Sequence, residues 1–132
     1  MCGLAGCFGI KDEDTINHML DALTHRGPND RGIHSGKQYT MGHTRLSIVD
    51  VATVHQPILT PDGKKGIIAN GEIYNFKVLK KNLTEPYEFA TQSDSEAVLA
   101  LYQEKGPDCV KDLDGMFAFA IFGEDTLLLA RD

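Results

Sequence analysis

The stretch MCGLAGCFG, residues 1–9, decides the fold, because it combines a cysteine at position two with small and apolar residues after it. The rest of this stretch predicts a strand, and its glycines leave the backbone open to close approach by a substrate. Removal of Met1 would put the Cys2 thiol beside its own α-amine, which titrates at about 7.7–8.0 in model compounds. Such an amine can act as a general base for its own side chain. Taken alone, however, Cys2 is more simply an ordinary residue at the start of a strand.

The remainder of the chain alternates between strand and helix patterns. Apolar residues at helical spacing predict helices, and short apolar runs between turn formers predict strands. The predicted helices cover residues 12–23, 76–83 and 93–105, and the predicted strands cover 3–9, 31–35, 39–49, 66–69, 116–122 and 126–130. Residues 51–65 are rich in turn formers and are expected to be irregular, while Asn70-Gly71 is typical of a tight hairpin turn. Strands outnumber helices, which indicates stacked sheets with helices outside them.

Composition and charge exclude several classes of protein. The 132 residues, 42% of them hydrophobic, suit one compact domain. A net charge of -6 repels phosphate backbones and argues against a nucleic-acid partner. The longest apolar run, residues 116–122, is too short to span a membrane, and the N-terminus has no secretory signal. The 3 cysteines, an odd number, fit a reducing cytoplasm.

A polar face is expected on the strand that contains GHTRLSI, residues 42–48. Strand alternation puts His43, Arg45 and Ser47 on one face of this strand. Arg45 would then project from a rigid element, and its guanidinium matches a carboxylate with two parallel hydrogen bonds. The commoner alternative is a surface arginine on a half-exposed strand.

Two further stretches, NGEIYN and SDSE, offer donors and charges that suit a catalytic site. The Asn70 side-chain amide and the Gly71 backbone N–H can both donate to a developing oxyanion. Losing one such donor typically costs about 2.7–4 kcal/mol of transition-state stabilisation. Asp94 can pair with an ammonium group while Ser93 and Glu96 form a helix-capping box. The simpler alternatives are a tight hairpin at the first stretch and a plain helix start at the second.

Several segments that span the whole chain occur together in a fixed order. They are MCGLAG (1–6), HRGP (25–28), GHTRLSIVD (42–50), QP (56–57), NGEIYN (70–75), SDSE (93–96), LDGMFAFAI (113–121) and LLARD (128–132). In content and order they resemble the N-terminal domain of class II glutamine amidotransferases, and most closely those of glutamine-dependent asparagine synthetases. HRGP and LDGMFAFAI favour this branch over the glucosamine-phosphate synthase and phosphoribosyl amidotransferase branches.

The resemblance implies an α+β fold, the N-terminal nucleophile hydrolase four-layer αββα sandwich, in which two antiparallel sheets face each other. It also implies that residues 1–132 form a glutamine amidotransferase type-2 domain. Family domains continue past LLARD into further strands and then into a separate ATP-dependent synthetase domain. The chain is therefore expected to be truncated and incomplete at the C-terminus, which would leave an exposed sheet edge.

The activity implied by the resemblance is hydrolysis of L-glutamine to glutamate and ammonia through a cysteinyl thioester. The implied site residues are Cys2 as the nucleophile, Asn70 and Gly71 as the oxyanion hole, Arg45 for the substrate α-carboxylate, Glu72 and Asp94 for its α-ammonium group, and Arg26 to hold the N-terminal backbone. No metal or organic cofactor is implied for this half of the reaction, since ATP and magnesium would belong to the synthetase domain.

The implied partners are L-glutamine, an ATP-dependent synthetase domain or subunit that uses the ammonia, and a second copy of the chain in a homodimer. No nucleic-acid or membrane partner is expected, and the expected compartment is the cytoplasm. The alternative is a catalytically inactive module that binds glutamine or docks a partner, since retention of Met1 would tie up the Cys2 amine in a peptide bond. A different N-terminal-nucleophile amidase fits less well, because it has no use for the pair Arg45 and Asp94.

Overall fold

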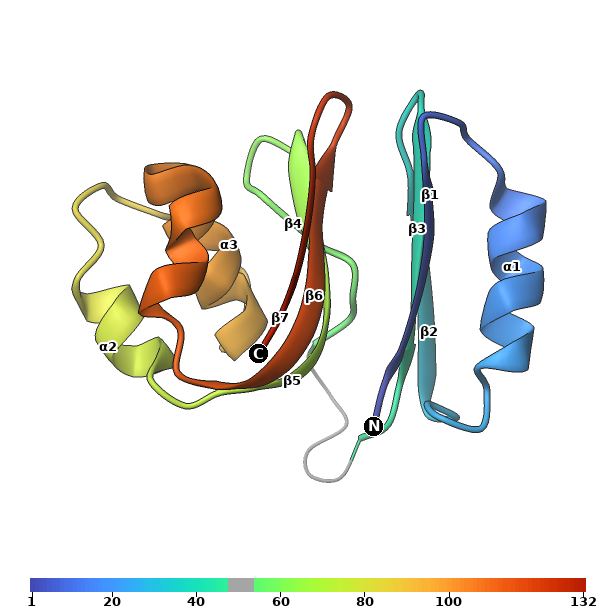
Figure 1. The fold of residues 1–132 in the computed structure, drawn as a ribbon, viewed down its shortest axis with the longest axis horizontal. Coiled ribbons are helices and arrows are strands. Elements are labelled where there is room, and N and C mark those ends of the chain that lie inside the picture. The colour runs from blue at the N-terminus through green and yellow to red at the C-terminus, as the bar shows by residue number, and fades with distance from the viewer. Residues whose placement is uncertain (48–53) are drawn as a thin grey trace.

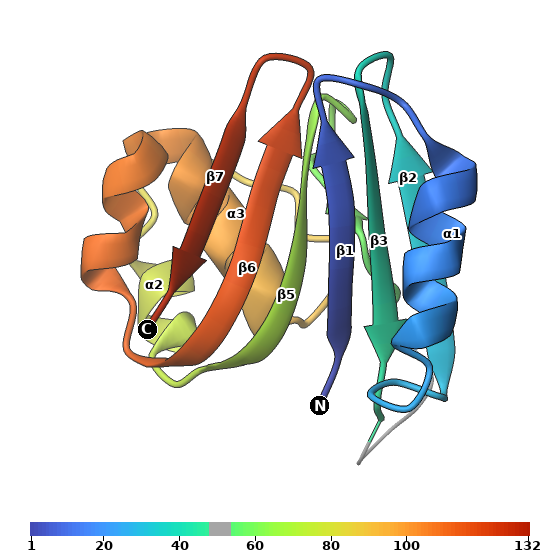
Figure 2. The same cartoon turned by 45° about the vertical axis from the view of Figure 1, so that its right-hand side comes forward.

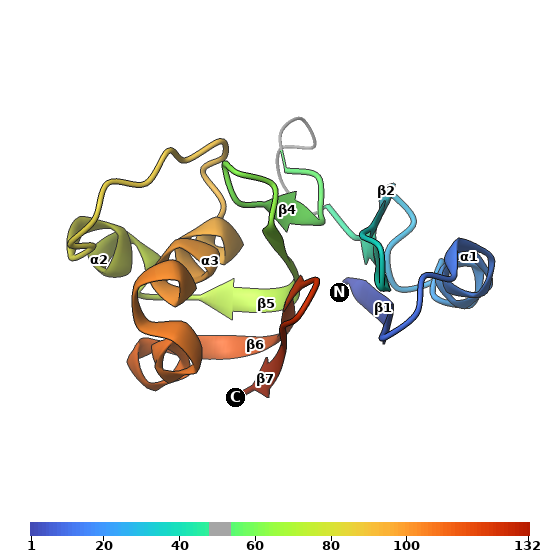
Figure 3. The ribbon, with the colours of Figure 1, turned by 90° about the horizontal axis from the view of Figure 1, so that it is seen from above.

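The computed structural model describes residues 1–47 and 54–132 and arranges them in four layers: helix, sheet, sheet and helix (Figure 1). Helix α1 (Glu13–Ala22) covers the outer face of one sheet, and helices α2 (Phe76–Lys81) and α3 (Asp94–Lys105) cover the outer face of the other. Seen from above, α1 and the pair α2 and α3 lie on opposite outer sides of the sheets (Figure 3). The predicted α+β sandwich with αββα layers is confirmed.

The first sheet is antiparallel, with β3 between β1 and β2. Its strands are β1 (Gly3–Phe8), β2 (Asp30–Ser35) and β3 (Tyr39–Arg45). Gly42 in β3 lets α1 pack closely, since a β-carbon there would lie 2.7 Å from the Leu20 side chain and 2.9 Å from that of Ile16. Leu20 and Ile16 are fully buried, so this contact anchors α1 on the sheet.

The second sheet is also antiparallel and has the order β4, β5, β6, β7, of which Figure 2 shows the last three side by side. Its strands are β4 (Ile58–Leu59), β5 (Lys65–Ile73), β6 (Gly115–Gly123) and β7 (Leu127–Arg131). The main core lies between this sheet and α3, where Ile67, Leu99 and Ile121 are completely buried. This core fixes the position of β5, the strand that carries the NGEIYN motif.

The hairpin turn predicted at Asn70-Gly71 is wrong. Strand β5 continues through both residues and pairs with β6 as far as Ile73, which lies opposite Gly115. Gly71 adopts a φ of 134°, a backbone conformation that glycine reaches readily and residues with a side chain rarely adopt. The long pairing with β6 and the burial of the strand outweigh the local turn preference of the dipeptide.

Other element boundaries also differ from the prediction. Residues 58–59, expected to be irregular, form β4, and the 3-10 helix η1 (Gly106–Asp112) follows α3 without having been predicted. Such short elements are set by their tertiary neighbours and carry little sequence periodicity. The strand predicted over 39–49 ends at Arg45, and residues 48–53 lie outside the described residues.

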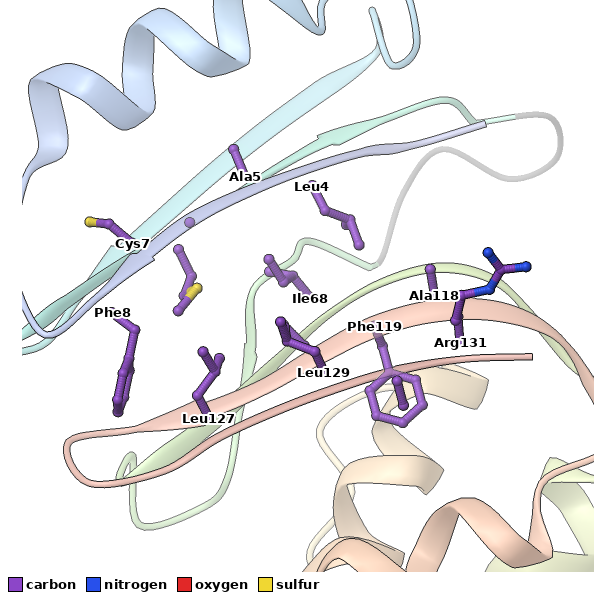
Figure 4. A pocket seen from close by; sticks show the side chains of 14 residues that line it. Leu4, Ala5, Cys7, Phe8, Ile68, Ala118, Phe119, Leu127, Leu129 and Arg131 are labelled. Atoms are coloured by element: carbon purple, nitrogen blue, oxygen red, sulfur yellow. The ribbon is translucent and has the colours of Figure 1, made fainter.

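An apolar cleft of about 430 Å³ separates the two edge strands β1 and β7. Figure 4 shows the side chains of Leu4 and Phe8 from β1 on one side of it and those of Leu127 and Leu129 from β7 on the other. Leu129 is 69% exposed in this cleft. The two sheets are therefore open to solvent along this side of the sandwich.

Candidate functional site

The backbone of Cys2 is held from both sides just before β1. Its N–H donates to Asn70 Oδ1 over 2.9 Å, and its carbonyl oxygen accepts a hydrogen bond from Arg26 Nε over 3.1 Å. Arg26, which the family resemblance assigns to the N-terminal backbone, thus contacts Cys2 directly. Because Met1 precedes Cys2 in the chain, this nitrogen belongs to a peptide bond; removal of Met1 would turn it into an α-amine beside Asn70.

Asn70 is oriented by the same contact. A main-chain N–H can only donate, so the Asn70 atom that faces Cys2 must be the carbonyl oxygen of the carboxamide. The Nδ2 group remains as a donor, and within residues 1–47 and 54–132 no protein acceptor binds it. Asn70 therefore offers an uncommitted N–H donor next to Cys2.

The edge of β5 that faces away from β6 supplies a second donor. Ala69 N–H donates to Gln56 Oε1 at 2.6 Å, and Ile73 N–H donates to Asp94 Oδ2 at 2.7 Å. Backbone groups in a strand alternate between its two edges, so Gly71 N–H lies on the same edge as these two amides. Side chains occupy the amides before and after it, which leaves Gly71 N–H available to a ligand.

The ladder between β5 and β6 does not use Gly71 N–H. Phe117 lies opposite Gly71, but its own N–H and carbonyl both bind Asp132 on the other side of β6. A β-carbon at Gly71 would overlap the carbonyl oxygen of Met116. Only glycine fits this position, and its amide lies on the free edge of β5, beside a cavity that Gly71 lines.

A cavity of about 450 Å³ opens beside Cys2, within the size range of small-molecule sites. Five of the predicted site residues line it, namely Cys2, Arg45, Gly71, Glu72 and Asp94. Asn70 and Arg26 do not line the cavity, but both hydrogen-bond to the backbone of Cys2. The structure thus brings all seven predicted residues together from five separate parts of the chain.

The charges of the cavity have opposite signs on different elements. Arg45 ends β3, and its Nη1 donates to the Val54 carbonyl at 2.9 Å, which leaves the rest of the guanidinium for a ligand. Asp94 is the first residue of α3, and its Oδ2 binds Ile73 N–H while keeping further acceptor sites. Glu72 is exposed at the cavity wall. One cation and two carboxylates suit a zwitterionic α-amino acid.

A family model described as a glutamine amidotransferase domain matches residues 1–132. The chain belongs to this family. Asparagine synthetase B (glutamine-hydrolysing) of Escherichia coli is 42% identical over 140 residues, covering 100% of this chain and 25% of that protein. A probable glutamine-hydrolysing asparagine synthetase of Schizosaccharomyces pombe is 38% identical over 139 residues, with the same coverage.

The amidotransferase domain spans about a quarter of the length of these curated relatives. Among solved structures, glutamine phosphoribosylpyrophosphate amidotransferase of Bacillus subtilis is similar, with a TM-score of 0.79 over 98% of this chain and 37% of that chain. The sequence identity to it is 21%, so this likeness supports the shared fold alone.

The loop before α3 is held by a residue whose role the sequence did not reveal. Glu96 is 1% exposed, and its carboxylate accepts hydrogen bonds from Ala90 N–H at 2.8 Å and from Thr91 N–H and Oγ1 at 2.7 and 2.6 Å. The predicted capping box is only half correct, because Ser93 caps Ser95 N–H while Glu96 reaches further upstream. Glu96 thus shapes the loop that leads to Asp94 in the amidotransferase domain.

His43 joins the two sheets directly behind Asn70. Its Nε2 lies 3.2 Å from the Ala69 carbonyl, and the side chain is 1% exposed. Burial lowers the pKa of His43 to about 4, so the ring is neutral near pH 7 and Nε2–H donates to Ala69. The sequence placed His43 on the Arg45 face of its strand, but only the packing of the two sheets shows this contact.

Among the described residues, no group of three or more His, Cys, Asp and Glu side chains is placed to hold a metal ion. Cys2, Cys7 and Cys109 are all free thiols. No helix in the same part of the chain is both long enough and apolar enough to cross a lipid bilayer.

Proposed function

We propose that this domain hydrolyses L-glutamine to L-glutamate and ammonia, with Cys2 as the nucleophile once Met1 has been removed. The observation that carries the proposal is the cavity beside Cys2, where two N–H donors and charges of both signs converge. Asn70 contacts the Cys2 backbone and Gly71 lines the same cavity as Cys2, so both can supply the oxyanion donors. Arg45, Glu72 and Asp94 provide the charges that an α-amino acid requires.

The proposed reaction has two stages. The α-amine of Cys2 takes the thiol proton, and the thiolate attacks the side-chain carboxamide carbon of glutamine. Asn70 Nδ2 and Gly71 N–H donate to the tetrahedral oxyanion. The protonated amine returns its proton to the departing nitrogen, so ammonia leaves and a glutamyl thioester remains. Water then attacks the thioester, releases glutamate and restores the thiol.

Recognition of the rest of the substrate follows from the same geometry. Arg45 would bind the α-carboxylate with the guanidinium N–H groups that Val54 does not use. Asp94 and Glu72 would take the α-ammonium group with their remaining oxygen lone pairs. This arrangement favours a free amino acid over a peptide-bound glutamine, which lacks both charges.

The ammonia needs an acceptor, because protonation in neutral water removes its nucleophilicity. We propose that the acceptor reaction takes place in an ATP-dependent synthetase domain or subunit, as the names of the asparagine synthetase relatives suggest. ATP and magnesium would act there, and the glutaminase half would need no cofactor. The proposed compartment is the reducing cytoplasm, in line with three free thiols, and the proposed assembly is a homodimer.

The test compares Met-free protein with its Cys2→Ala variant and with protein that retains Met1. Met-free protein should release glutamate from L-glutamine and should form a covalent adduct at Cys2 with a glutamine-like electrophile, seen by intact mass spectrometry. The other two proteins should do neither. Glutamine binding that persists unchanged in all three, without any hydrolysis, would favour the alternative of a non-catalytic glutamine-binding module.

A further inference from the structure

We propose that Gln56 is a specificity residue that binds the α-carboxylate of the substrate together with Arg45. The proposal rests on the function proposed above, since it assigns one more residue to the same amino-acid site. Gln56 lies in the cavity wall with Cys2 and Arg45, although nothing in the sequence marked it beyond its place in a short motif.

The backbone that carries Gln56 is fixed on both sides. The Val54 carbonyl, two residues earlier, accepts a hydrogen bond from Arg45 Nη1 at 2.9 Å. The Gln56 carbonyl packs directly on Gly32 of β2, where a β-carbon would overlap it. Gln56 and Arg45 are therefore both fixed in the wall of one cavity before any ligand binds, as an effective binding site requires.

The orientation of the Gln56 carboxamide follows from its partner. Ala69 N–H donates to it at 2.6 Å, so the bound atom must be the carbonyl oxygen Oε1. The opposite orientation would bring two donors together. The Nε2 group consequently keeps both of its hydrogens for other partners, and no acceptor for them occurs in the ranges 1–47 and 54–132.

Two donors side by side, one of them charged, match a carboxylate. Arg45 supplies the positive charge but has committed Nη1 to Val54, so a second donor from Gln56 can serve the carboxylate oxygen that Arg45 leaves open. A neutral carboxamide in the ligand would instead bring its own N–H groups against these donors. Gln56 therefore helps distinguish an α-carboxylate from an uncharged α-amide.

The test measures binding in the Cys2→Ala background, where hydrolysis cannot interfere. Gln56→Glu keeps an oxygen acceptor for Ala69 N–H but replaces the donor with a negative charge, and Gln56→Met removes the donor without adding charge. Calorimetric titration should show that both changes weaken binding of L-glutamine by about tenfold or more. Binding of L-glutamine α-amide, which lacks the carboxylate, should change by much less than binding of L-glutamine.

Near-normal affinity for L-glutamine in either Gln56 variant would overturn the inference, and so would an equal loss for both ligands. If Gln56 only positioned Ala69, the Gln56→Glu variant should bind L-glutamine normally, because this variant preserves the hydrogen bond to Ala69 N–H. Failure of the proposed function is a separate result. The Gln56 variants would then still weaken L-glutamine binding as described, but the Met-free wild-type protein would release no glutamate.

Discussion

Single hydrogen bonds from main-chain N–H groups orient the side-chain amides of this site. Cys2 N–H fixes the oxygen of Asn70, and Ala69 N–H fixes the oxygen of Gln56. In both residues the NH₂ group has no acceptor within residues 1–47 and 54–132 and can donate to a ligand. Replacement of either amide by a carboxylate therefore separates two roles, because the acceptor stays in place while the donor is lost.

Asn70→Asp is expected to lower kcat for glutamine hydrolysis by about 10²–10³-fold, since it removes one oxyanion donor and leaves the contact to Cys2 N–H. Steady-state kinetics of the Met-free protein measure this loss. Gln103→Glu, the same chemical change at an exposed position on α3, is the matched control and should stay near wild type. A kcat for Asn70→Asp within a few-fold of wild type would rule out Asn70 as an oxyanion donor.

His43 should make the stability of the domain depend on pH. Its pKa is about 4 in the folded protein, against 6.5 for the free side chain, so the unfolded chain binds a proton that the folded state excludes. One pKa unit corresponds to about 1.4 kcal/mol, so the free energy of unfolding should fall by about 3 kcal/mol between pH 7 and pH 4 through this residue.

Urea unfolding of wild-type protein and His43→Gln at both pH values measures this contribution. The glutamine keeps a donor for the Ala69 carbonyl but cannot be protonated, so the variant should lose about 3 kcal/mol less than wild type on acidification. His18→Gln, at an exposed position, serves as the control and should keep the wild-type dependence. Parallel pH profiles for wild type and His43→Gln would contradict the assignment.

At the scale of elements, helix α3 begins with a capping-box motif in which Glu96 binds the preceding loop and not the helix N-terminus. Its first residues carry the spacing of a capping box, yet Glu96 accepts from Ala90 and Thr91 and leaves the N-terminal cap to Ser93. Residues 95–102 of the helix are all buried, so Glu96 can bind the loop that folds over it. That loop ends at Asp94, which binds β5.

Glu96→Ala should lower the free energy of unfolding by about 3 kcal/mol, because it leaves two main-chain N–H groups and the Thr91 hydroxyl without their acceptor. Glu96→Gln, which keeps one oxygen, should lose less. Glu104→Ala is the matched control: Glu104 also accepts a main-chain N–H, from Glu85, but through a solvent-exposed hydrogen bond, so the loss should stay below about 1 kcal/mol. Equal losses in chemical denaturation for Glu96→Ala and Glu104→Ala would refute this account.

On the scale of the whole molecule, polar contacts join the two sheets at several points, whereas the edge strands β1 and β7 are separated by an open cleft. His43 binds Ala69, Cys2 binds Asn70, and the Glu124 carboxylate at the far end accepts N–H groups from Lys37 and Gln38. Opposite these contacts lies the apolar cleft between the edge strands β1 and β7 (Figure 4). Exposed apolar surface of this kind tends to bind other apolar groups.

The cleft should therefore bind an environment-sensitive hydrophobic dye in the native state. Leu129→Lys should reduce the native-state dye fluorescence severalfold, since it puts a charge at the most exposed apolar position of β7. Val78→Lys makes the same change at an exposed valine on α2, away from the cleft, and should leave the fluorescence unchanged. Equal effects of the two substitutions would show that the dye binds elsewhere.

Sequence patterns were sufficient for the features that depend on local periodicity or on ordered motifs. Helix α1 and the β6–β7 hairpin follow from apolar spacing, and the motifs around Cys2, Arg45 and Asp94 identified the family before any geometry was known. Periodicity reports which face of an element is apolar, and this property belongs to the segment itself. These features could therefore be predicted without knowing what each element packs against.

Only the tertiary structure decided what each backbone amide and buried side chain contacts. Asn70-Gly71 reads as a hairpin turn by itself, but pairing with β6 keeps it extended and turns the Gly71 amide toward the cavity. Gln56, His43 and Glu96 gain their roles from partners 13, 26 and 5 to 6 residues away in the chain. Hydrogen bonds between separate segments depend on how the sheets stack, and one segment's sequence pattern does not encode that packing.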